Sequence, residues 1–158
     1  MPTEHEKFMR RAIELAQRGV DSNDGGPFGC VVVRGGEIIG EGWNQVTSAN
    51  DPTAHAEVVA IRDACSHVES FQLEGCTIYT SCEPCPMCLG AIYWSRPEAI
   101  YIAANREDAA AAGFDDSLIY DELEKPNENR RLRMQPLLRD EALAVFRNWV
   151  EKPDKTEY

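Results

Sequence analysis

The stretches His55-Ala56-Glu57 and Pro84-Cys85-Pro86-Met87-Cys88 are the features around which the rest of the chain is interpreted. They supply one imidazole and two thiolates, which are three ligands for a tetrahedral Zn²⁺ whose fourth position stays open for water. Glu57 is a spare carboxylate close to the histidine, and it is suited to move the proton of that water. These residue types at these spacings therefore predict a zinc site with an open position.

Cys82 leaves two other kinds of metal site open. The run of Cys82, Cys85 and Cys88 resembles part of an iron–sulfur motif, but no further cysteine follows Cys88 at a suitable spacing. A closed structural zinc site would take Cys82 as a fourth protein ligand beside His55. Because Cys82 precedes Glu83-Pro84, outside the helix expected to aim the other two sulfurs, we predict that it is not a ligand.

Hydrophobic periodicity and turn residues predict an α/β domain in which strands alternate with helices. The expected helices cover residues 4–18, 54–67, 84–95, 108–112 and 140–150, and the expected strands cover residues 28–33, 37–43, 77–80, 99–103 and 132–137. Gly35-Gly36 is the expected hairpin turn, Gly19 ends the first helix, and residues 113–126 are expected to be irregular. Both metal-binding motifs then fall at helix starts, where the helix dipole favours thiolates.

Size and charge restrict the class of protein and its partners. With 158 residues the chain fits a single domain, residues 1–158, and no stretch approaches the length of a membrane span. The net charge of −11 disfavours nucleic acids, whose binding depends on neutralising phosphates. The only basic concentration, Arg130-Arg131-Leu132-Arg133, is interpreted as a solvated strand end. No secretion signal is visible, so we expect a cytoplasmic protein that binds neither membrane nor nucleic acid.

The zinc motif, within Thr80-Ser81-Cys82-Glu83-Pro84-Cys85-Pro86-Met87-Cys88, resembles that of the cytidine deaminase-like superfamily, and within it the chain resembles the bacterial guanine deaminases. The closer resemblance is carried by residues 25–29, 48–55, 88–94 and 113–120, and by the ending Lys155-Thr156-Glu157-Tyr158. The matching stretches cover most of residues 25–126, whereas residues 127–150 are less distinctive. The resemblance implies a three-layer α/β/α fold with a central mixed five-stranded sheet.

The implied activity is the zinc-dependent hydrolysis of guanine to xanthine and ammonia. The resemblance implies that His55, Cys85 and Cys88 hold one Zn²⁺ per subunit. It implies that Glu57 moves the protons. Asn44 and the backbone near Ala56 would hydrogen-bond the base, Phe28 and Trp94 would line or stack on it, and Asp116 would pair with its ring N–H groups and take part in catalysis.

The resemblance also implies a homodimer with an exchanged C-terminal segment, about residues 127–158, in which Tyr158 closes the partner's pocket. Residue chemistry alone leaves plainer roles open. Phe28 and Trp94 are suited to core packing, and Asn44 to ending a strand. Asp116 is suited to a solvated surface, and Tyr158 to a frayed terminus.

Three other activities compete with guanine deamination. A tRNA adenosine deaminase shares the zinc motif, but its substrate is a large polyanion and this chain is strongly acidic. A cytidine deaminase also shares the motif, although residues 113–120 do not resemble that family. The alternative from another class is a zinc-stabilised interaction module without turnover. Against it stand the spare carboxylate of Glu57 and an open zinc position.

Overall fold

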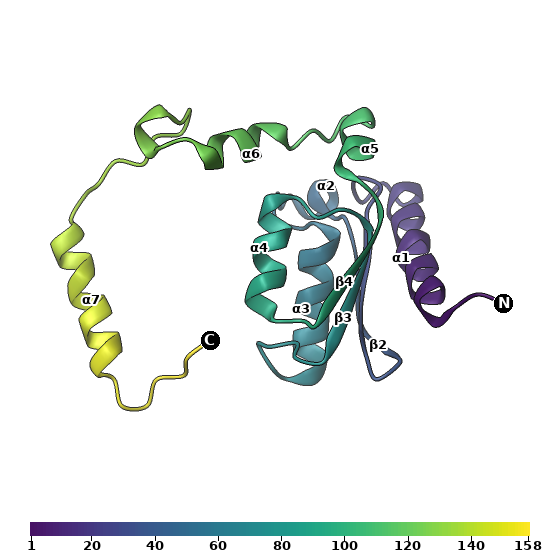
Figure 1. Ribbon diagram of the computed structural model, residues 1–158, viewed down its shortest axis with the longest axis horizontal. Helices are drawn as coiled ribbons and strands as arrows, with labels where there is room; N and C mark the ends of the chain where they lie inside the picture. The colour runs from purple at the N-terminus through teal and green to yellow at the C-terminus, as the bar shows by residue number, and fades with distance from the viewer. The chain divides into compact units, whose positions relative to one another are not determined.

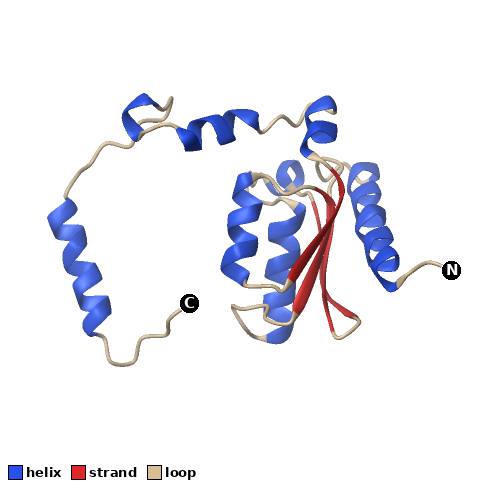
Figure 2. Cartoon of the chain, in the orientation of Figure 1, coloured by secondary structure: helices blue, strands red, loops and turns tan.

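A mixed sheet with the strand order β2-β1-β3-β4 forms the centre of the fold. The structure is a computed structural model that describes residues 1–158. Strand β1 (Gly29–Arg34) pairs antiparallel with both β2 (Glu37–Trp43) and β3 (Cys76–Cys82), and β3 pairs parallel with β4 (Ala99–Ala104) (Figure 2). The expected hairpin turn is confirmed, because β1 and β2 meet at Gly35-Gly36 and both glycines have positive φ.

The structure has the five expected helices, with shifted bounds, and two helices that were not expected. The helices are α1 (Glu4–Asp21), α2 (Val46–Ala49), α3 (Ala56–Val68), α4 (Pro86–Ser95), α5 (Arg106–Ala111), α6 (Ser117–Glu124) and α7 (Arg139–Glu151), with a 3₁₀ turn at Asn127–Asn129. None of them is long and apolar enough to cross a membrane. The chain divides into two compact units, Met1–Asp116 and Ser117–Tyr158. The expected single domain stays a prediction.

Within the first unit, helices cover both faces of the sheet (Figure 1). On one face, Leu15 of α1 packs with Val31 and Tyr79. On the other face, Ala60 of α3 and Ile92 of α4 belong to a second buried cluster, which also contains residues of the strands. Side chains alternate between the faces of a strand, so β1 and β3 contribute to both clusters and are buried on both sides. The expected three-layer α/β/α class is confirmed.

Three local expectations are wrong. The expected fifth strand, residues 132–137, is irregular backbone, and the sheet has four strands. Pro136 has no N–H to donate to a ladder, which disfavours a strand there. The expected irregular stretch contains helix α6. Gly19 is not a terminator, because α1 continues to Asp21; a Cβ at Gly19 would lie 2.9 Å from the Trp43 ring, so the residue serves close packing instead.

The position of α3 on the sheet is set by a glycine in β2. A Cβ at Gly42 would overlap the backbone of Ala56 and Ala60, so only glycine lets the first turns of α3 lie this close to the strand. His55 immediately precedes this helix. The small residues of β2 and α3 therefore fix where the first metal-binding motif stands relative to the sheet.

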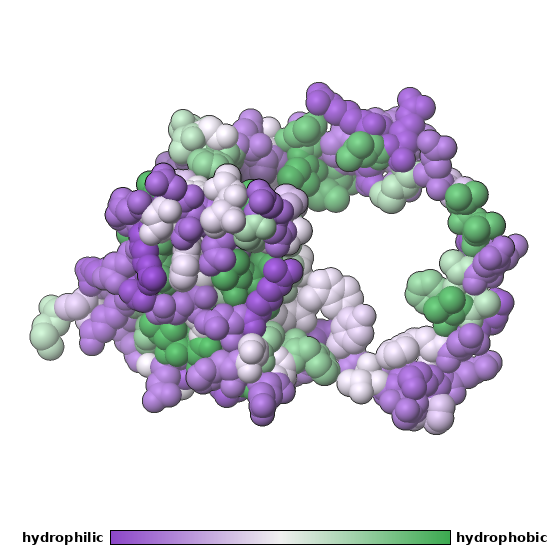
Figure 3. All heavy atoms as spheres, turned by 180° about the vertical axis from the view of Figure 1, so that it is seen from behind, coloured by the Kyte–Doolittle hydropathy of each residue, from purple (hydrophilic) through white to green (hydrophobic).

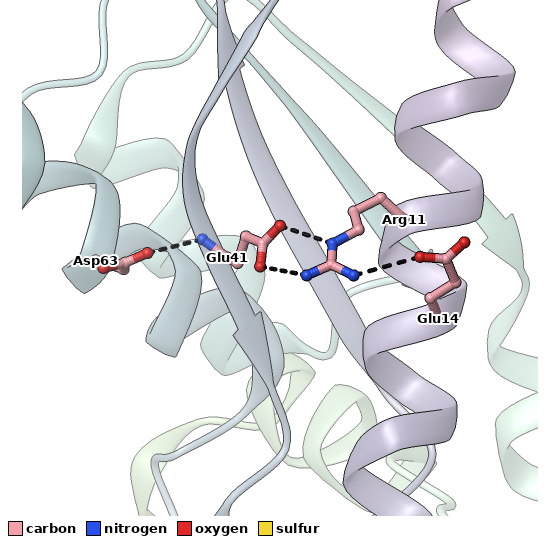
Figure 4. A network of polar contacts seen from close by, with 4 residues as sticks. All are labelled: Arg11, Glu14, Glu41 and Asp63. Atoms are coloured by element: carbon pink, nitrogen blue, oxygen red, sulfur yellow. Dashed lines mark hydrogen bonds and ion pairs between the residues drawn. The ribbon is translucent and has the colours of Figure 1, made fainter.

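A polar network joins α1, β2 and α3 (Figure 4). Arg11 donates to both carboxylate oxygens of Glu41, at 2.7 and 2.8 Å, and the backbone N–H of Glu41 donates to Asp63 at 2.9 Å. The hydrogen bonds from Arg11 lower the pKa of the Glu41 carboxyl group. Because β2 is an edge strand, the bond to Asp63 also satisfies a backbone donor at the edge of the sheet.

We expect Glu41→Gln to lower the free energy of unfolding at pH 7 by about 0.5–1 kcal/mol, since the pair is bidentate but partly exposed. The folded-state pKa of Glu41 is depressed, so its stabilisation is full above about pH 4.3, the ordinary value for Glu. It is lost as the pH falls through the folded-state pKa. In urea unfolding, the difference in free energy of unfolding between the wild type and Glu41→Gln should therefore become smaller at acid pH. Glu37→Gln, at the exposed start of β2, is the control, and equal stability of the two variants at pH 7 would contradict the prediction.

Candidate metal centre

The N-termini of α3 and α4 each begin at a residue with a metal-binding side chain. His55 is the N-cap of α3 and Cys85 is the N-cap of α4, and both have extended backbone. N-cap side chains commonly accept a hydrogen bond from their own helix, but neither His55 nor Cys85 does so. Pro86 occupies the first turn of α4, where its missing N–H costs nothing. The two side chains are thereby left to interact with each other.

The donor atoms of His55, Cys85 and Cys88 lie within 4.8 Å of one another. His55 Nδ1 is 3.5 Å from Cys85 Sγ and 3.4 Å from Cys88 Sγ. Zinc bonds of about 2.0 Å to nitrogen and about 2.3 Å to sulfur, at a tetrahedral angle, place these atoms about 3.5 Å apart. The donor set and its spacing therefore fit zinc, with Nδ1 as the histidine ligand.

Hydrogen bonds within the cluster shift the pKa values of its members in different directions. The bond from the Cys88 thiol, together with His55, lowers the pKa of Cys85 to about 4. The pKa of Cys88 is raised, because the Cys85 sulfur, burial and the Glu57 carboxylate all disfavour a second negative charge. The bond to Cys85 raises the pKa of His55. A divalent cation between these groups would replace the protons that the cluster otherwise shares.

Glu57 lies beside the metal-binding side chains and is buried. Its carboxylate is close enough to Cys88 and His55 to shift both their pKa values. Thr80 donates to its Oε1 at 2.7 Å. A buried carboxylate at this position, held by a hydrogen bond and next to the donor cluster, can exchange protons with a ligand bound there.

Cys82 is not part of the donor cluster. Its Sγ lies 3.6 Å from the carbonyl oxygen of Asn105, and burial together with Glu57 raises its pKa to about 11. Cys82 is the last residue of β3, whereas Cys85 and Cys88 belong to the cap and first turn of α4. The change from strand to helix thus separates the third sulfur from the other two.

Asn44 and Phe28 are adjacent in space although they come from different segments. Asn44 is buried, its N–H donates to the Phe28 carbonyl, and its Oδ1 accepts the N–H of Val46 at 3.1 Å. The amide nitrogen of Asn44 is therefore the side-chain group left to donate. The Phe28 ring meets Phe114 edge to face at 5.0 Å between centroids. These contacts orient both residues, to which the family resemblance assigns contacts with the base.

The remaining expected site residues differ in their surroundings. Ala56 is the first residue of α3 and is buried, so its N–H belongs to the unpaired donors of the helix start. Burial and the charge of Cys85 raise the pKa of Asp116, which places this acid within electrostatic range of the cluster. Trp94, on α4, is 64% exposed, and Tyr158, in the second unit, is 71% exposed.

Two residues in contact with expected site residues belong to the quoted motifs but were given no role in the sequence analysis. Thr80 contacts Glu57, and Gly25 contacts Asn44, since a Cβ at Gly25 would overlap the amide oxygen of Asn44. Both contacts join residues far apart in the chain. The glycines at 25 and 26 could have indicated a close approach, but nothing in the sequence named what approaches them.

The family model described as the cytidine and deoxycytidylate deaminase zinc-binding region matches residues 2–104. This range includes both metal-binding motifs and the whole sheet. The chain therefore belongs to this family of zinc-binding deaminases, and the expected resemblance to the superfamily is confirmed. The donor cluster and the family together support zinc as the metal.

Within the family, the chain is 55% identical to the guanine deaminase of Bacillus subtilis (strain 168) over 154 residues, which is 98% of this chain and 99% of the relative. The X-ray structure of that guanine deaminase superposes with a TM-score of 0.95 and covers 98% of each chain. A tRNA-specific adenosine deaminase of Aquifex aeolicus is 32% identical over 148 residues, 93% of this chain and 94% of the relative. A guanine deaminase structure from Nitrosomonas europaea has 30% identity and a TM-score of 0.69, covering 94% of this chain and 85% of that one.

We expect Cys85→Ser to lose most of the bound zinc and Cys82→Ser to keep it, because a serine hydroxyl is a poor replacement for a thiolate ligand. Elemental analysis of the purified variants measures the zinc content per subunit. Equal loss in both variants would contradict the three-ligand site and favour a closed site with four protein ligands.

Proposed function

We propose that this protein catalyses the hydrolytic deamination of guanine to xanthine and ammonia. The observation that carries the proposal is the near full-length match to the Bacillus subtilis guanine deaminase. The donor cluster beside the buried carboxylate of Glu57 supports it. In the reaction a water oxygen bonds to C2 of the purine, the bond from C2 to the exocyclic nitrogen breaks, and the amine leaves as ammonia.

The proposed zinc site has three protein ligands, His55, Cys85 and Cys88, and holds one ion per subunit. When bound, zinc activates a water molecule at near-neutral pH by lowering its pKa to about 7. A fourth protein ligand would block this chemistry, and the position of Cys82 against the Asn105 carbonyl group supports its absence from the coordination shell. The count of three ligands thus distinguishes an enzyme from a structural zinc module.

Glu57 is the proposed proton carrier. Its carboxylate takes a proton from the attacking water and returns protons to the purine, first to a ring nitrogen and then to the leaving amine. The hydrogen bond from Thr80 orients the carboxyl group, and the closeness of Glu57 to Cys88 and His55 puts it within reach of a ligand at the metal centre. The same group can therefore serve both proton transfers without leaving its place.

Three groups near the centre are proposed to recognise the edges of the base. The Asn44 amide nitrogen is a donor, because Val46 already occupies the amide oxygen, and a donor suits the O6 carbonyl group of guanine. The N–H of Ala56, at the start of α3, is a second donor. The Asp116 carboxylate is an acceptor for ring N–H groups. We propose that Asp116 also takes part in the proton transfers.

Phe28 and Trp94 are the proposed aromatic walls of the pocket. Phe28 is held by the edge-to-face contact with Phe114, so its ring has a defined direction. A planar neutral purine fits between aromatic faces, and such a site needs no net positive charge. This agrees with a protein that carries a net charge of −11.

We further propose a homodimer that exchanges its C-terminal segment, about residues 127–158. No residue of the second unit, Ser117–Tyr158, is buried, and Figure 3 shows hydrophobic residues, in green, on its surface. An amphipathic helix normally buries its apolar stripe, so the exposed apolar residues in this unit support the proposal that a second copy covers this surface. The exposed large apolar residues of the two longer helices in this unit are Leu118, Ile119, Leu123, Val145, Phe146, Trp149 and Val150.

Within this dimer Tyr158 is proposed to close the pocket of the neighbouring subunit, and its side chain is largely exposed in the single chain. The proposal also includes a cytoplasmic location, a small purine as the substrate and no binding of nucleic acid. The tRNA adenosine deaminases share the zinc-binding fold, but the relative from Aquifex aeolicus is only 32% identical. An acidic surface also opposes tRNA binding.

The direct test of the function is ammonia release from guanine, adenine, cytidine and cytosine, followed by the same assay on Glu57→Gln. We expect turnover of guanine by the wild type, and a kcat lower by about 10²–10⁴-fold in the variant with its zinc retained, because the amide cannot carry the proton. A near-normal rate of Glu57→Gln would contradict the role of this residue. Zinc at full occupancy without turnover of any substrate would instead favour an interaction module.

The role of the tail predicts that Tyr158→Ala lowers kcat/KM for guanine by about tenfold or more, since an open pocket positions substrate poorly. Zinc content should stay unchanged. Glu157→Ala is the matched control, and sedimentation analysis of the wild type should show a dimer. Unchanged kinetics in a chain that ends before Lys155 would refute closure by the tail.

A further inference from the structure

Thr80 is a fully buried polar residue of β3 that contacts the proposed proton carrier. Its Oγ1 is 2.7 Å from Oε1 of Glu57 and 3.0 Å from the carbonyl oxygen of Cys82. Neighbouring Ile78 belongs to the core cluster between the sheet and α3, so Thr80 brings its hydroxyl group to the same face of the sheet. The hydroxyl group is thus placed where apolar packing alone would favour valine.

The side chain of Thr80 is well suited to hold another group in place. Threonine is branched at Cβ, which restricts its χ1, and a side chain without solvent exposure has little room to change rotamer. The Glu57 side chain has more rotatable bonds and would need another restraint if this contact were removed. One hydrogen bond from a fixed hydroxyl group to Oε1 sets the rotation of the carboxyl group and therefore the direction of its second oxygen.

The Thr80 hydroxyl group has two acceptors within reach of its Oγ1. A threonine hydroxyl has one proton, so it donates either to Glu57 or to the Cys82 carbonyl oxygen at any moment. A carboxyl group that passes a proton is by turns an acceptor and a donor. Thr80 can donate to Oε1 in the first case, and can accept from it while donating to Cys82 in the second. The hydroxyl group therefore has an acceptor within hydrogen-bond distance in either orientation.

We propose that Thr80 is a positioning residue for the deamination, which it serves by fixing the carboxyl group of Glu57 beside the metal centre. This inference rests on the proposed function. Thr80 acts through Glu57 and touches neither the metal ligands nor the substrate in this account. The competing explanation is a buried hydroxyl group that serves only the packing of β3. The two explanations differ in whether kcat depends on the hydroxyl group.

The test compares Thr80→Val, Thr80→Ser and the control Thr77→Val, which makes the same change on β3 but on the opposite face of the sheet. We expect Thr80→Val to lower kcat for guanine by about 10–100-fold, with KM within about threefold of wild type and zinc content unchanged. Thr80→Ser should recover most of the lost kcat, because it restores the donor. Thr77→Val should keep the wild-type kcat.

Several outcomes would overturn the proposal. A kcat of Thr80→Val equal to that of Thr77→Val would show that the hydroxyl group has no role in turnover, and a failure of Thr80→Ser to recover kcat would assign the loss to packing. If Thr80→Val does not fold, Thr80→Cys replaces it. The thiol group is a weaker donor, so Thr80→Cys should have a kcat between those expected for Thr80→Ser and Thr80→Val, at unchanged zinc content. A wild-type kcat of Thr80→Cys would refute the positioning role of Thr80. A wild type without activity on guanine would refute the proposed function itself, whereas an active wild type with an active Thr80→Val refutes only the role of Thr80.

Discussion

The convergence of two helix starts on one face of the sheet is the constraint on which the metal centre depends. His55 and Cys85 are N-caps whose side chains do not cap their own helices, and Cys88 follows in the first turn of α4. The donor atoms can meet only if α3 and α4 lie at fixed positions on the sheet. Gly42 supplies part of this constraint by letting α3 approach β2 closely. The zinc site is therefore a product of backbone packing, and the side chains complete it.

The proposed proton carrier is placed by the same packing. Glu57 is in the first turn of α3 and is held by Thr80 from the neighbouring strand, so helix and sheet together determine where its carboxyl group stands. The proposed base-binding residue Asn44 depends on the loop before β1 in a similar way, because Gly25 permits its approach. A hydrolytic site on this fold thus needs small residues at contact points as much as it needs reactive ones.

The sequence predicted the parts of the structure that are local. The metal-binding motifs, the glycine hairpin and most elements of the first unit follow from spacing and turn chemistry. The contact of Thr80 with Glu57 spans 23 residues and depends on how α3 packs on the sheet, which no local pattern contains. The second unit was the least predictable: α6 was missed and the strand at residues 132–137 was wrong, because apolar residues there are not buried within the chain. Periodicity indicates an apolar face but not the surface that covers it.

X-ray absorption at the zinc edge of the purified protein tests the central claim most directly, since it reports the number and kind of ligands around the ion. The account predicts two sulfur atoms at about 2.3 Å and two lighter atoms at about 2.0 Å, one from His55 and one from solvent. Addition of a purine should perturb the lighter shell and leave the sulfur shell unchanged. Three sulfur atoms around the zinc would contradict the account, because the ion would then have no open position.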